Sequence, residues 1–141
     1  MTEDDIRIAL VDHFKKLNEV SGAEFITDSN VYVSNENKAF SIPEDERWFE
    51  IAVMFGEGTR NSLGAGTGVN YSGTMQIEVC IPKDCGVEEA EDKSKYIHEL
   101  FALGTNIDDI VEINGITVDA EMATELCFKK IIRVMWTSDI Y

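Results

Sequence analysis

Residues 48–82 read WFEIAVMFGEGTRNSLGAGTGVNYSGTMQIEVCIP, two runs of alternating apolar residues joined by a glycine-rich connection. Alternation with a period of two is typical of a strand with one buried face, so residues 47–55 and 73–82 are predicted to be neighbouring antiparallel strands. Pro82 ends the second strand because it cannot donate a hydrogen bond to a ladder. The predicted buried faces are Phe49, Ile51, Val53 and Phe55 in the first strand, and Met75, Ile77, Val79 and Ile81 in the second.

The connection between these strands, residues 56–72, is far longer than a hairpin needs. Long loops without structure of their own are usually functional or disordered, and this one carries no catalytic constellation. A phosphate cradle would need a strand, a glycine-rich turn, a lysine and a helix, whereas here strand leads to strand and the loop has no lysine. We interpret the loop as a contact segment, in which Arg60 either pairs with a carboxylate of a neighbouring subunit or remains a solvated surface side chain.

Two flanking segments show helical periodicity. Residues 2–17 carry apolar side chains at three- and four-residue steps, and Thr2 and the acidic residues after it suit a helix N-terminus. Residues 87–103 repeat the pattern, with acidic residues near the start and Gly104 placed as a terminator. The sequence therefore predicts two amphipathic helices, one before and one after the strand pair.

The other segments give weaker signals. Between residues 18 and 45 we expect one short strand and loops. Residues 110–118 are interrupted by Asn114-Gly115, a favoured two-residue hairpin turn, and residues 129–138 alternate as a final strand. The pattern of residues 119–128 fits a helix or a strand.

Length and charge limit the possible functions. A chain of 141 residues fits one domain, residues 1–141, and buries roughly 70% of the surface that its unfolded form exposes. Twelve Lys and Arg against 27 Asp and Glu give a net charge of −15, which argues against stable binding of nucleic acid. The apolar runs are too short for a bilayer and the first residues are acidic rather than leader-like, so we expect an intracellular protein without a membrane partner.

The residues with chemical potential do not form a recognisable site. Three cysteines, Cys80, Cys85 and Cys127, are expected as reduced thiols, and their role is left open. Cys80 and Cys85 lack the spacing of a zinc knuckle, and His13 and His98 lie on separate predicted helices. A Cys–His pair that meets only in the fold would show no local signature. We predict no catalytic residue, no metal site, no cofactor and no enzymatic activity.

Residues 48–66, with 71–86 and Glu89-Ala90, resemble a family of tailed-bacteriophage proteins: the tail terminators, also called tail completion or minor tail proteins. The shared features are a strand that begins with an aromatic residue, the glycine-rich loop with its arginine and Ser-Leu-Gly, a glycine opening the next strand, and a Pro-to-Gly turn before a helix. The resemblance implies an α+β domain, in which a mostly antiparallel sheet packs against two main helices.

The same resemblance implies a function without catalysis. Proteins of this kind assemble as a ring, implied to be a hexamer, at the head-proximal end of the tail tube. The ring stops tube polymerisation and offers a surface to the head–tail connector. The implied partners are further copies of the chain, the major tail tube protein and the connector. The implied location is the virion tail, after assembly in the host cytoplasm.

A ring needs two complementary surfaces on each subunit, and the glycine-rich loop could supply one of them. We also expect the acidic charge to line the lumen, so that DNA passes without sticking. The nearest alternative is a head–tail joining or neck protein; alternatives from other classes are a small cytosolic hydrolase and a host regulatory module that binds peptides through the loop. The predicted interface residues are Gly56, Arg60, Asn61, Ser62, Leu63, Gly64, Gly66 and Tyr71.

Overall fold

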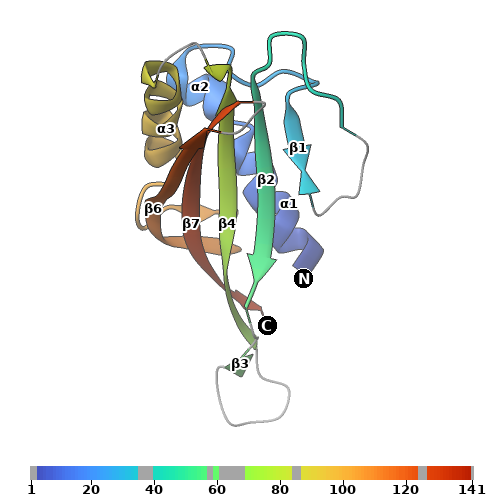
Figure 1. Cartoon of the computed structure of the whole chain (residues 1–141). Helices are drawn as coiled ribbons and strands as arrows, with labels where there is room; N and C mark the ends of the chain where they lie inside the picture. Colours follow the sequence, from blue (N-terminus) through green and yellow to red (C-terminus); the bar gives the residue numbers. More distant parts are fainter. Residues whose placement is uncertain are drawn as a thin grey trace.

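The computed structural model describes residues 3–34, 40–56, 59–60, 69–83, 87–123 and 127–140, which form an α+β fold. The seven strands of these ranges form a single sheet, and the three helices lie beside it (Figure 1). In chain order they are α1 Glu3–Phe14, α2 Leu17–Ser21, β1 Val31–Val33, β2 Trp48–Phe55, β3 Thr59–Arg60, β4 Val69–Ile81, α3 Glu88–Leu100, β5 Asn106–Ile107, β6 Val111–Ala123 and β7 Phe128–Ile140.

The sheet has the strand order β1-β2-β4-β7-β6-β5, and β3 pairs with β4 outside this path. The predicted pairing of β2 with β4 is confirmed as antiparallel, with Trp48 opposite Cys80 and Phe55 opposite Gly73. The short β1 runs parallel to β2, so the sheet is mixed although most of its pairs are antiparallel. At its centre, β7 pairs along its whole length with β4 on one side and along much of it with β6 on the other.

The core lies between one face of the sheet and the helices. The predicted alternation is confirmed, because Ile51 and Val53 of β2 and Ile77 of β4 are fully or almost fully buried on this face. Phe14 of α1 meets Phe49 of β2 edge to face, with ring centroids 5.3 Å apart. Burying a large apolar side chain contributes about 1.5–3 kcal/mol, so this layer is the main source of stability.

The two predicted helices are present with different ends. The first stops at Phe14, and a separate short helix, α2, follows; it ends at Ser21 and is capped by Gly22 in the left-handed conformation (φ 70°). The second ends at Leu100, three residues before the predicted end, so that Gly104 (φ 86°) lies in the following turn rather than at the helix cap. On α3, Lys93 is buried, and its Nζ lies 5.4 Å from the centroid of the Phe49 ring.

The predicted hairpin at Asn114-Gly115 is wrong. Both residues belong to β6, which runs as one strand beside β7. The register between β6 and β7 shifts at two irregularities, one between Ile113 and Gly115 and one between Val118 and Ala120. Long-range pairing with β7 therefore overrides the local turn preference of Asn-Gly. Residues 119–123, whose sequence pattern fits a helix or a strand, belong to β6 and so to the sheet.

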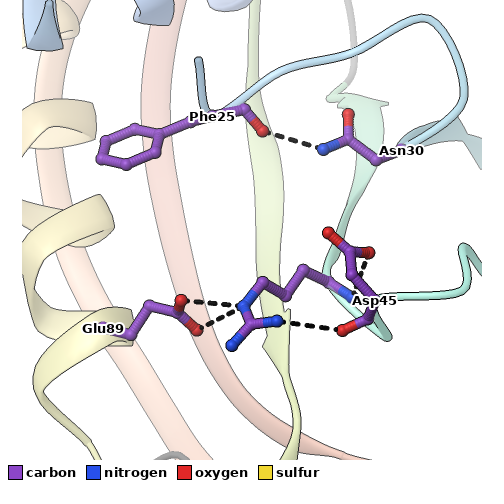
Figure 2. Close-up of polar contacts among 5 residues, drawn as sticks. Phe25, Asn30, Asp45 and Glu89 are labelled. Carbon is purple, nitrogen blue, oxygen red and sulfur yellow. Dashed lines mark hydrogen bonds and ion pairs between the residues drawn. The ribbon is translucent and has the colours of Figure 1, made fainter. Parts of the chain in front are cut away.

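A polar network joins the segment before β2 to α3. Arg47 Nε donates to both carboxylate oxygens of Glu89, at 2.8 and 3.0 Å, and Nη1 donates to the carbonyl oxygen of Asp45 at 3.1 Å. Nearby, Asn30 Nδ2 donates to the carbonyl oxygen of Phe25 at 2.8 Å (Figure 2). These bonds hold the approach to β2 against the first turn of α3 and so position the strand for the sheet.

Candidate functional site

Part of the predicted contact loop is strand. β3 pairs with the beginning of β4, with Thr59 opposite Asn70 and Arg60 opposite Val69, and β4 begins at Val69 rather than at Gly73. The prediction of a structureless connection over residues 56–72 is therefore wrong, because only 61–68 separate the two paired strands. We call the unit formed by β3, residues 69–72 of β4 and residues 137–140 of β7 the arm, which projects beyond the helices (Figure 1).

The base of the arm is fixed by close backbone packing. The amide of Gly56 donates to the carbonyl oxygen of Ser72 at 2.7 Å. Gly73 lies under the Trp136 ring, and a Cβ there would clash with the carbonyl oxygen of Met54 and stand 2.6 Å from Trp136 Cζ2. Trp136 in turn meets Phe55 edge to face at 5.2 Å. A side chain does not fit at Gly73, so the glycine allows the arm to leave the core at this point.

The structure distributes the predicted interface residues along the arm. Gly56 is exposed at its base, and the half-buried Tyr71 packs against the hydrophobic core. The backbone of Arg60 pairs with Val69 at the end of the β3–β4 ladder. The remaining predicted residues, Asn61, Ser62, Leu63, Gly64 and Gly66, lie outside the described residues.

A carboxylate pair on the face of the sheet opposite the core was not predicted as a site. Glu50 of β2 stands directly opposite Glu78 of β4, and Lys129 Nζ lies 3.9 Å from an oxygen of each. Burial, followed by the hydrogen bond and the charge of Glu50, raises the pKa of Glu78 from 4.5 to about 7, although Lys129 lowers it. The alternation had placed both glutamates on the face away from the core, but their register required the structure.

Cys80 and Cys127 belong to a small second cluster with Trp48 and Phe40. Both cysteine side chains are fully buried. Burial, followed by the neighbouring Cys127 thiol, raises the pKa of the Cys80 thiol far above its usual range. Since the thiolate is the nucleophilic form, this arrangement favours a packing role for Cys80. Cys85 lies outside the described residues.

The rings of both histidines bond to backbone carbonyl oxygens of α3. The ring of His13 bonds through Nε2 to the carbonyl oxygen of Leu100 at 2.8 Å and meets the Phe101 ring edge to face. The ring of His98 bonds through Nδ1 to the carbonyl oxygen of Ser94 at 2.8 Å. Within the described ranges, no three His, Cys, Asp or Glu side chains converge as metal ligands. In that part of the chain, no helix has the length and apolar character to cross a membrane.

The fold recurs in solved structures, of which 24 chains match. One of them, a protein described only by a sequence identifier, aligns with 100% of this chain and 98% of its own at a TM-score of 0.73. The two sequences are 18% identical, so this likeness shows a shared fold alone. No curated protein matches the sequence. Among protein families, the model described as phage tail terminator protein matches residues 5–134.

Proposed function

The chain belongs to the phage tail terminator family, and from this membership we propose that it caps the head-proximal end of the tail tube as an oligomeric ring. Members of this family are structural proteins of the phage tail rather than enzymes. In the proposed role the ring halts polymerisation of the tube and offers a binding surface to the head–tail connector. The observation that carries the proposal is the family match, which covers residues 5–134.

The two borders of the sheet support assembly into a ring. On the outer side of β2, Phe49–Ile51 pair with β1; on the outer side of β6, Val111 and Glu112 pair with β5, and the backbone of Ile113 bonds to Gly104 and Thr105. Within the described part of the chain, no strand pairs with the outer side of residues 52–55 of β2 or of residues 114–123 of β6. Open strand borders are templates for pairing with another chain. Exposed apolar side chains lie on the same strands: Met54, Val118 and Met122.

The arm supplies a further surface for assembly in this proposal. Head-to-tail rings join two different surfaces of each subunit, and a projecting element can reach a neighbour. We place the subunit or tube interface on residues of the arm and of the segment that joins its strands: Gly56, Arg60, Asn61, Ser62, Leu63, Gly64, Gly66 and Tyr71.

The net charge suits a ring through which DNA passes. At −15 the protein repels phosphate groups, so carboxylates that face the lumen would leave the polyanion free to move. A hexamer that assembles in the host cytoplasm and remains in the virion tail completes the proposal, with the major tail tube protein on one side and the connector on the other.

Inactivating the gene and imaging the particles tests this function. We expect overlong tails without heads, and complementation with the wild-type gene should restore tails of normal length. Tails of normal length that lack heads would instead indicate the joining or neck role, because length control would then be intact. Normal virions would refute both roles. Native mass spectrometry of the purified protein should show a ring, and a persistent monomer would contradict ring formation.

A further inference from the structure

An acidic groove lies between α1 and the turn that joins β5 to β6. Asp5, Ile8 and Asp12 follow one face of α1, three and four residues apart, and Ile8 is 53% exposed. The turn opposite contains Asp108 (φ 52°) and is closed by a hydrogen bond from the amide of Ile110 to the carbonyl oxygen of Ile107, at 2.9 Å. The resulting hollow has a volume of about 390 Å³ and is lined by Asp5, Ile8, Ala9, Asp12, Asp108 and Ile110.

The groove is lined by apolar and acidic residues. Three of its six lining residues are aspartates, and none is basic. Arg7, which lies on α1 close to Asp5 and Ile8 in sequence, forms an ion pair with Asp4 at 2.7 Å. Among the described residues, neither Asp12 nor Asp108 forms an ion pair. An occupant that matches this surface therefore combines a cationic group with an apolar side chain.

The arm and its connecting segment have the complementary character. Residues 58–77 contain no Asp or Glu and a single basic residue, Arg60, in a chain that otherwise carries 27 acidic residues. Arg60 pairs with Val69 at the end of the β3–β4 ladder, and residues 61–68 are the sequence segment that connects these two paired positions. This segment carries Leu63 three residues after the arginine. The guanidinium group suits carboxylates because its planar donors can bind two oxygens at once.

We propose that Arg60 and Leu63 of one subunit occupy the acidic groove of the next subunit in the ring. This inference rests on the proposed ring and names the receptor surface for the arm. Arg60 pairs with Asp12 and Asp108, and Leu63 covers Ile8 and Ile110. Because the arm and the groove are different surfaces of the same chain, the contact is head-to-tail and repeats around a closed ring.

Charge reversal at both surfaces tests the contact. The arm variant is Arg60→Glu, and the groove variant combines Asp12→Lys with Asp108→Lys. We expect each variant alone to weaken subunit association at least tenfold in sedimentation velocity and native mass spectrometry, and Ile8→Ser to weaken it as well. Control variants are Lys95→Glu and the pair Asp92→Lys with Glu99→Lys, which make the same charge changes on exposed positions of α3. The controls should associate as the wild type does.

Mixing the two reversed variants is the decisive measurement. In an alternating ring each acidic arm meets a lysine-bearing groove and each native arm meets a native groove, so the mixture should recover association to within about threefold of the wild type. Unchanged association of either reversed variant, or failure of the mixture to recover, would overturn the proposal. Recovery only when all three substitutions share one chain would show that the arm occupies its own groove. A wild-type protein that never oligomerises would instead refute the ring itself.

Discussion

Glu78 is the residue whose environment departs most clearly from that of a surface carboxylate. Its neighbour across the strands is another glutamate, and the only cation close to both, within the described part of the chain, is Lys129 at 3.9 Å. The pair holds like charges on adjacent strands, which destabilises a sheet when both groups are ionised. Burial of the Glu78 carboxyl, followed by its hydrogen bond with Glu50 and the charge of Glu50, favours the protonated form, so its raised pKa follows from its position in the sheet.

Glu78→Gln should therefore change stability in a pH-dependent way. The unfolded chain releases the Glu78 proton near pH 4.5, whereas the folded protein retains it until about pH 7, so folding stability falls as pH rises across this window. The amide removes that loss, and we expect a gain of about 1–2 kcal/mol in the free energy of unfolding above pH 7 and little gain below pH 4.5. Urea unfolding at both pH values measures it. The exposed Glu88→Gln is the control, and an equal gain at the two pH values would contradict the mechanism.

Gly73→Ala should destabilise the fold strongly. The added methyl group would meet the carbonyl oxygen of Met54 and the Trp136 ring, neither of which can move without disturbing the base of the arm. We expect a loss of about 2–3 kcal/mol in the free energy of unfolding, measured by urea titration.

Gly115→Ala is the matched control in the same sheet. A Cβ at Gly115 would meet the flexible end of Met135, 2.8 Å from Cε, which can change rotamer. Its expected cost is below about 1 kcal/mol. If both alanine variants lose the same free energy of unfolding, the close packing around Gly73 is not the reason that a glycine is required there.

Among the helices and strands, local sequence patterns predict those in which one face is buried. The alternation in β2, β4 and β7 and the apolar stripes of α1 and α3 depend on which face is buried, so these elements were found. The prediction for β6 is wrong because Asn114-Gly115 favours a turn locally, whereas pairing with β7 keeps both residues in the strand. The sequence does not predict the arm, because the glycines around residues 69–72 favour a loop although these four residues alternate between apolar and polar.

The open strand borders lead to a prediction about assembly. Met54→Lys on β2 or Val118→Lys on β6 places a charge at a border where another strand would approach, and lysine on edge strands opposes such pairing. Both side chains are at least 40% exposed, so the free energy of unfolding should change by less than about 0.5 kcal/mol. We expect subunit association, measured by sedimentation velocity, to weaken at least tenfold.

The control for these border variants is Leu103→Lys, at an apolar side chain that is 74% exposed and lies outside the sheet. It should leave association unchanged. If Met54→Lys and Val118→Lys assemble as well as this control, strand borders do not form the subunit contacts.

At the scale of the molecule, the candidate site divides into a part that the sequence reveals and a part that it hides. The glycine-rich stretch with a single arginine stands out in an acidic chain, so one partner of the proposed contact could be selected from the residues alone. The groove could not be found in this way. Its carboxylates come from α1 and from a turn about a hundred positions later, and only the packed fold brings Asp12 and Asp108 to one hollow.

The central place of β7 bears on the order in which the chain can fold during synthesis. Strands β2, β4 and β6 leave the ribosome before β7, yet β4 and β6 meet only through it. A nascent chain that ends before Phe128 therefore holds two unjoined sheet fragments, and Ile77 and Ile113 lack the neighbours that bury them in the finished protein. Insertion of the last strand converts these fragments into one sheet.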